Sequence, residues 1–253
     1  MTSQEYLEGL LAKYNLTDAD VEKVQNKRKG VEEFLKKRVG DKIDRFYYSG
    51  SYAKKTAISL DYDLDLCIYF KPNSYTSLRT MYEDTCNNLK DFGQIDPRNV
   101  SIRLPQGSGL SVDVVPGRLI SNASDDINLY SRLKDTSMKS NIPKHKEEIS
   151  KSECRPIIKL MKIWKHQHGI HYKSFALELL TMEALKNFPK NDYGNALMRV
   201  LNFAVDNVET IKLIDPANSG NDVSDSISAV DKNNLKNQAA SSLKQQYWEQ
   251  IVW

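Results

Sequence analysis

Cysteine is scarce in this chain of 253 residues, which contains three: Cys67, Cys86 and Cys154. They are far apart and form no Cys-x-x-Cys pair, so neither a disulfide framework nor a cysteine-based zinc site is expected. Long apolar runs are missing too. No window approaches eighteen consecutive apolar residues and the N-terminal stretch lacks a signal-peptide pattern, which indicates a cytoplasmic protein that spans no membrane.

A strong charge of one sign is also missing, since 36 Lys and Arg stand against 33 Asp and Glu, a net charge of +3. Such a surplus does not indicate a protein that coats long nucleic acids. The positive charge is concentrated instead in residues 139–173, which hold nine Lys or Arg, three Asp or Glu and all four histidines. We expect an anion to bind this stretch.

Hydrophobic periodicity predicts an α+β first part and a helical second part. In the first part we expect helices at 17–39 and 78–92, strands at 43–49, 60–70, 99–104 and 110–116, and a turn at 105–109. In the second part we expect helices at 155–167, 174–188, 195–205 and 235–251. We therefore predict one domain at 1–138, which includes the long N-terminal helix, and a helical one at 139–253.

Three aspartates are placed to form a cluster. In the strand that ends at residue 70, side chains alternate, so Asp63 and Asp65 lie on the face opposite the apolar residues. The same alternation places Asp113 opposite its valine neighbours on another strand. Neighbouring carboxylates repel, and a hard divalent cation with oxygen ligands offsets that repulsion best, so magnesium is the natural candidate. Three carboxylates can hold two such ions, which would activate a hydroxyl for attack on a phosphoryl group. For Asp61 we prefer the simpler interpretation of a turn residue.

The pair Gly50 and Ser51 follows a β-rich run and precedes a short segment that can form a helix. Backbone N–H groups and a hydroxyl at a helix start can bind phosphate, although a Gly-Ser pair alone is most often only a turn. What gives the pair weight is its position shortly before the paired aspartates.

These residues together resemble a known superfamily. The segments GSYAKKTAISLDYDLDLCIYF and SVDVVP are similar to those of the DNA polymerase β-like nucleotidyltransferases. The resemblance implies that Asp63, Asp65 and Asp113 are catalytic and bind two Mg²⁺, for which Mn²⁺ can substitute. It implies that Gly50 and Ser51 hold a triphosphate. The fold implied is a nucleotidyltransferase core with a small mixed sheet, packed on a helical C-terminal lobe with the active site in the cleft between.

The second part resembles one branch of that superfamily. The stretch KLMKIWKHQHGIHYKSFALELL and the later LIDPANSGNDV are similar to the branch of cyclic GMP-AMP synthase, oligoadenylate synthase and the bacterial CD-NTases. The resemblance implies that Lys162 and Ser174 contact the donor triphosphate and that Phe175 stacks on a base. The simpler alternatives are a solvated lysine, a helix N-cap and a core phenylalanine.

The function implied by the resemblance is a nucleotidyltransferase that makes cyclic di- or trinucleotide second messengers from NTPs, ATP among them, in bacterial anti-phage (CBASS) signalling. Its diffusible product would reach a separate effector, and neither a membrane nor long nucleic acid is expected as a partner. Two alternatives stay open: a template-independent RNA nucleotidyltransferase of the CCA-adding or poly(A) type, and an inactive fold used as a binding module. Zinc is not expected at His166, His168 and His171, because their spacing fits no zinc motif.

Overall fold

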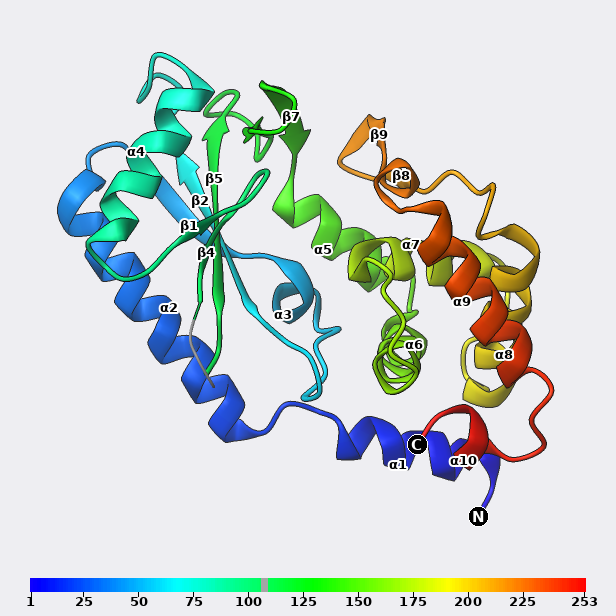
Figure 1. Cartoon of the computed structure of the whole chain (residues 1–253). Coiled ribbons are helices and arrows are strands. Elements are labelled where there is room, and N and C mark those ends of the chain that lie inside the picture. The colour runs from blue at the N-terminus through cyan, green and yellow to red at the C-terminus, as the bar shows by residue number, and fades with distance from the viewer. Residues whose placement is uncertain (106–108) are drawn as a thin grey trace. The chain divides into compact units, whose positions relative to one another are not determined.

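The computed structural model describes residues 1–105 and 109–253, and these form two compact units (Figure 1). The sheet unit contains Thr17–Lys54 and Tyr62–Lys146, and the helical unit contains Met1–Leu16, Lys55–Asp61 and Glu147–Trp253. Each unit holds both helices and strands, and the α+β class expected from the sequence is confirmed. The division into domains at residue 138 stays a prediction.

The sheet unit is built around a mixed sheet. Its strands within the described residues are β1 Ile43–Tyr48, β2 Leu64–Phe70, β3 Asp96–Pro97, β4 Ile102–Leu104, β5 Val112–Leu119, β6 Ile127–Ser131 and β7 Thr136–Ser140. The order is β1-β2-β5-β4-β3, with β6 paired to β5 and β7 to β6. Strands β2 and β5 run parallel and the other pairs are antiparallel. Its helices are α2 Asp18–Val39, α3 Gly50–Lys54 and α4 Leu78–Lys90.

The two faces of this sheet bury different residues. Helices α2 and α4 contribute to one apolar cluster together with Leu64, Leu66, Val112 and Val114. The alternate residues of β2, Cys67 and Tyr69, belong to a second cluster. The predicted alternation along both strands is therefore confirmed, and it leaves Asp65 and Asp113 on the face turned away from α2 and α4.

Long helix α2 starts where its sequence predicts. Thr17 accepts a hydrogen bond from the Asp20 amide, and the Asp20 carboxylate accepts one from the Thr17 amide, which makes a capping box. Such reciprocal caps satisfy backbone N–H groups that have no partner inside the helix. Apolar residues Val24, Val31 and Leu35 then bury one stripe of the helix against the sheet.

The helical unit has a core of its own, which includes Trp164, Leu177, Leu197 and Leu235. Helix α5, Ile142–Lys151, begins in the sheet unit and ends in this one. Its other elements are α1 Ser3–Lys13, α6 Arg155–Gln167, α7 Ser174–Ala184, α8 Tyr193–Asn207, β8 Ile214–Asp215, β9 Asn218–Asp222, a 3₁₀ turn at Val223–Ser226, α9 Ala229–Ser242 and α10 Trp248–Ile251. Among the described residues, no helix combines the length and the apolar character needed to cross a bilayer.

Some predicted elements differ from the structure. The helix predicted at 235–251 is wrong as one element, because α9 ends at Ser242 and α10 starts at Trp248. The intervening Lys244, Gln245 and Gln246 are exposed, so a continuous helix would bury nothing there. Strands β6 and β7 are not among the elements predicted from the sequence. Residues 106–108 of the predicted turn at 105–109 lie outside the described residues.

Candidate active site

Two of the predicted carboxylates lie side by side. In the parallel pairing of β2 with β5, Asp65 is the register partner of Asp113. Neighbouring strands are about 4.8 Å apart, and register partners in them point to the same face. Asp63 lies directly before β2 and is separated from Asp65 by one residue. The fold thus brings together three acidic side chains that the sequence places 50 residues apart.

The environment of Asp65 disfavours its charge. Burial, and next the charge of Asp113, raise the pKa of Asp65 to about 6, while the charge of Lys54 acts in the opposite direction. Like charges close together in a partly desolvated place make ionisation costly. A bound cation would relieve this cost and lower the pKa of Asp65.

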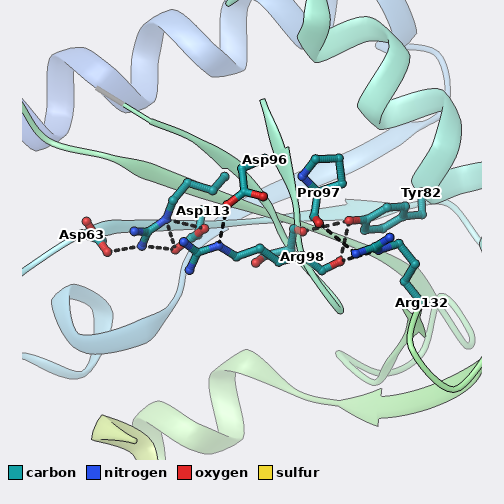
Figure 2. A network of polar contacts seen from close by, with 9 residues as sticks. Asp63, Tyr82, Asp96, Pro97, Arg98, Asp113 and Arg132 are labelled. Atoms are coloured by element: carbon teal, nitrogen blue, oxygen red, sulfur yellow. Dashed lines mark hydrogen bonds and ion pairs between the residues drawn. The ribbon is translucent and has the colours of Figure 1, made fainter. Parts of the chain in front are cut away.

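An arginine that sequence reasoning missed lies among these carboxylates. On β4, Arg103 is the antiparallel register partner of Asp113. Its Nη2 donates to Asp113 Oδ2 at 2.7 Å and its Nε donates to Asp113 Oδ1 at 3.2 Å. The same Nη2 also donates to Asp63 Oδ2, and Figure 2 shows Asp63 and Asp113 in one network of contacts. The available signal was the triplet IRL, because period-two alternation turns its arginine away from the core.

The predicted Gly50 is required by close packing against the carboxylates. It starts α3 with a φ of +58°, and a Cβ added there would come within 1.7 Å of Asp65 Oδ2. The Ser49 amide also donates to the Asp65 carbonyl oxygen at 2.8 Å. A side chain at position 50 would therefore push the Asp65 carboxylate aside. Ser51 follows within α3 and is partly exposed.

A second missed residue, Lys54, ends α3. It is 7% exposed, and its charge lowers the pKa of Asp65. A buried lysine needs negative charge nearby, so Lys54 contributes to the charge balance of the carboxylates. It follows Ser51 by three residues, which places both on neighbouring positions of one helical turn.

The other three predicted residues belong to the helical unit. Lys162 lies on α6 and is buried; its Nζ donates to Glu178 Oε1 at 2.6 Å, to Thr56 Oγ1 at 3.0 Å and to the Thr56 carbonyl at 3.2 Å. These contacts match the three N–H donors of a lysine ammonium. Lys162 thus forms a buried ion pair, and this is not the exposed position of a solvated helix face.

Ser174 opens helix α7 and has a lysine partner that the sequence analysis did not single out. Lys165 Nζ donates to Ser174 Oγ at 3.2 Å and to the Tyr172 carbonyl at 3.3 Å. Burial lowers the pKa of Lys165. Phe175 is half-buried and packs against the core of this unit. A cationic and a hydroxyl group therefore meet at the start of α7.

One of the histidines, His168, has structural surroundings. His168 Nε2 lies 2.8 Å from the Ile251 carbonyl oxygen, which can only accept, and its Nδ1 lies 2.9 Å from Gln238 Nε2. This assigns the proton to Nε2. The ring also packs edge-on against Trp253. His168 thus fastens the segment after α10 to the helical unit.

The carboxylates fit a hard divalent cation by their chemistry, because carboxylate oxygens are the ligands that Mg²⁺ prefers. Their arrangement in this structure, however, is not that of a metal site. Within residues 1–105 and 109–253, no three His, Cys, Asp or Glu side chains are placed to hold a metal ion together. Arg103 takes up oxygens of both Asp63 and Asp113. The donor set is present, and a guanidinium occupies part of it.

Known proteins resemble the chain in sequence. Residues 1–152 match the family described as the Second Messenger Oligonucleotide or Dinucleotide Synthetase domain. The cyclic AMP-AMP-AMP synthase of Escherichia coli strain MS 115-1 is 27% identical over an alignment 255 positions long. The alignment covers 91% of this chain and 78% of that synthase.

Solved structures resemble it in fold. The structure of E. coli MS115-1 CdnC with ATP has a TM-score of 0.78 at 19% identity and covers 99% of this chain and 97% of its own. The Bradyrhizobium diazoefficiens CD-NTase CdnG in complex with GTP has a TM-score of 0.77 at 12% identity, covering 95% and 90%. At these identities the likeness shows a shared fold.

Replacing Gly50 with Ala should displace the Asp65 carboxylate, because the new Cβ would overlap Asp65 Oδ2 and the backbone is left-handed there. We expect a loss of about 1–3 kcal/mol in the free energy of unfolding, measured in urea. Gly93→Ala is the matched control, since nothing lies within 4 Å of a Cβ at that position. Equal stability of the two variants would contradict the packing described here.

Replacing Asp65 with Asn should stabilise the metal-free fold in a pH-dependent way. A carboxyl whose pKa rises on folding from 3.8 to about 6 binds its proton more tightly in the folded chain. Its ionised form therefore lowers stability as pH rises through this range, by about 1–3 kcal/mol at pH 7.

The measurement is thermal unfolding in EDTA at pH 4 and pH 7. The increase in unfolding temperature that Asp65→Asn produces should be near zero at pH 4 and largest at pH 7. Asp61→Asn is the control, because Asp61 is exposed and lies outside the cluster. A gain that is the same at both pH values would show that charge repulsion is not its cause.

Proposed function

We propose a substrate and a product for this chain on the premise that it belongs to the CD-NTase family of second-messenger synthetases, whose domain matches residues 1–152. Members of this family are nucleotidyltransferases that are generally metal-dependent and make cyclic oligonucleotides from NTPs, so the chain is an enzyme of that class. The nucleotidyltransferase fold and the family expected from the sequence are confirmed. As substrate we propose ATP, and as product cyclic AMP-AMP-AMP, because the relative named for that product aligns over 91% of the chain.

The observation that carries this proposal is the register pairing of Asp65 with Asp113, with Gly50 packed against Asp65. Two carboxylates held side by side next to a Gly-Ser turn can bind the positively charged ions that phosphoryl transfer needs. In such reactions most of the rate enhancement comes from positioning and from stabilising charge. A 3′ or 2′ hydroxyl of one nucleotide would attack the α-phosphate of another, and pyrophosphate would leave.

We propose that Asp63, Asp65 and Asp113 hold two Mg²⁺ ions, for which Mn²⁺ can substitute. When bound, such ions neutralise phosphoryl charge and make the attacking hydroxyl more acidic. The support from this chain is the oxygen donor set and the raised pKa of Asp65, about 6. The backbone N–H groups at the Gly50–Ser51 turn would hold the triphosphate, and Lys54 adds positive charge to this neighbourhood.

In the helical unit we propose that Lys162 and Ser174 contact the donor triphosphate and that Phe175 stacks on a base. Lys165 joins this set, because it donates to Ser174 Oγ at 3.2 Å. Lys162 would have to exchange a bond to Glu178 or Thr56 for one to phosphate. A hydrogen bond from a charged group is stronger than a neutral one, so the lysines should contribute more than the serine.

The setting we propose is bacterial anti-phage (CBASS) signalling in the cytoplasm, where NTPs are abundant. The product would diffuse to a separate effector. No long nucleic acid is needed, since the local surplus of positive charge suffices for a triphosphate.

Incubation with single NTPs and Mg²⁺, then phosphatase treatment and mass spectrometry, tests the substrate and product. A cyclic product has no terminal phosphate, so ATP alone should give a phosphatase-resistant species with the mass of cyclic triadenylate. Asp113→Asn is the negative control. A resistant product only with other NTPs would contradict ATP as the sole substrate. Label transfer to RNA 3′ ends, with no resistant small product, would favour the RNA-tailing alternative.

Lys162→Met and Lys165→Met separate two lysine roles on one helix. Lys162→Met removes the cation beside the fully buried Glu178 and should cost about 3–5 kcal/mol of unfolding free energy. Lys165→Met should leave stability within about 1 kcal/mol and weaken ATP binding roughly tenfold. Unfolding in urea and ATP titration by calorimetry measure the two effects.

The matched control is Lys159→Met, since Lys159 lies on the same helix and bonds to Asn15 at 2.9 Å outside this set. An equal loss of ATP affinity at 159 and 165 would mean that the lysines act only as a general positive field. A stable Lys162→Met variant would contradict the buried ion pair.

A further inference from the structure

Arg103 lies among the carboxylates and bonds to two of them, Asp63 and Asp113. Its Nη2 bridges Asp63 and Asp113, and its Nε adds bonds of 3.2 and 3.3 Å to the two Asp113 oxygens. The Arg103 and Asp113 side chains are 22% and 11% exposed, so the pair is largely shielded from water. Shielding strengthens such a charge pair and makes either partner costly to leave alone.

The bridge uses oxygens that a cation would need. Both Oδ atoms of Asp113 and Oδ2 of Asp63 accept hydrogen bonds from the same guanidinium. A metal ion bound by these two aspartates must take an oxygen of Asp113. Asp113 Oδ2 accepts from both Nη2 and Nε, which uses both of its lone pairs, and Oδ1 accepts from Nε, so an entering ion has to compete with the guanidinium for these oxygens. This agrees with the finding that no acidic or histidine trio in residues 1–105 and 109–253 is placed to hold a metal.

Strand pairing keeps the Arg103 guanidinium close to the carboxylates. Arg103 is held opposite Asp113 by the β4–β5 pairing, while Asp113 is held beside Asp65 by the β2–β5 pairing. Ile102 and Leu104, which flank Arg103, are buried in the core and prevent the strand from rotating. The guanidinium therefore stays near the carboxylates whether or not a cation is present.

We propose that Arg103 is a positioning residue that serves as the built-in counterion of the carboxylates, bridging Asp63 and Asp113 in the metal-free chain and yielding to an entering divalent cation. The inference rests on the proposed metal site. It predicts that Arg103 stabilises the empty site and weakens metal binding, two effects of opposite sign that an ordinary structural salt bridge would not produce together.

The test is a Mn²⁺ titration of the full chain without nucleotide, in which electron paramagnetic resonance counts the free ion. Arg103→Met should bind Mn²⁺ about tenfold more tightly than the unchanged chain, the order expected when one charge-assisted interaction stops competing. Arg98→Met is the matched control. Arg98 pairs with Asp96 of β3 at 3.3 Å, so its loss should change affinity less than twofold.

Thermal unfolding supplies the second readout. In EDTA, Arg103→Met should unfold at a lower temperature than the unchanged chain. In saturating Mn²⁺, the two unfolding temperatures should lie closer together. Arg103→Lys keeps the charge but cannot bridge two carboxylates with one planar group, so it should show a smaller change of the same sign in both assays. This variant also keeps the test valid if Arg103→Met does not fold.

The outcomes are distinct. Tighter Mn²⁺ binding by the Arg103 variants, with lower stability in EDTA, supports the proposal. Unchanged or weaker Mn²⁺ binding, with Mn²⁺ still bound by the unchanged chain, overturns the role of Arg103 and leaves the metal site standing. Absence of Mn²⁺ binding in every variant overturns both.

Discussion

Burial of the apolar face of β2 and β5 is the interaction on which the acidic face of the sheet unit depends. The register of Asp65 and Asp113 is fixed by the opposite face of the same strands, where Leu64, Leu66 and Val114 are fully buried. Each such side chain contributes about 1.5–3 kcal/mol on burial, and a one-residue slip would expose the whole set. The free energy gained by burying these side chains exceeds the electrostatic cost of holding two carboxylates side by side. The apolar face therefore holds the acidic face in an arrangement it would not adopt alone.

Much of this arrangement could be predicted from the sequence. The period-two pattern of DLDLCIYF and SVDVVP assigns each aspartate to a face without knowledge of the fold, because successive side chains of any strand point to opposite faces. What the pattern could not supply was the strand order. The adjacency of Asp65 to Asp113 depends on β5 pairing in parallel with β2, which requires the crossover through α4. Alternation allowed a neighbouring strand to bring Asp113 to the cluster, and the resemblance to a known superfamily favoured that arrangement.

The counterions were missed for a physical reason. Arg103 and Lys54 belong to no motif, and their position depends on which strand or helix lies next to the aspartates. Lys162 was predicted as a site residue, but its partner Glu178 was not, because Glu178 lies on the following helix and their contact depends on how the two helices pack. A local pattern shows that a carboxylate on a strand needs compensation. It does not show whether a side chain or an ion provides it, and in this chain a side chain already provides part.

The ion pair of Lys162 and Glu178 has a further consequence through the chain itself. Thr56, which bonds to both, lies in Lys55–Asp61, the short segment of the helical unit that is inserted between α3 and β2 of the sheet unit. The residues before this segment carry Gly50 and Ser51, and those after it carry Asp63. The residues that we propose to bind phosphate and metal are thus joined along the chain, on both sides, to a segment that bonds to a buried ion pair of the helical unit. We expect a substitution that disturbs this pair to loosen the segment as well, so the activity of a Lys162 variant is to be interpreted together with its free energy of unfolding.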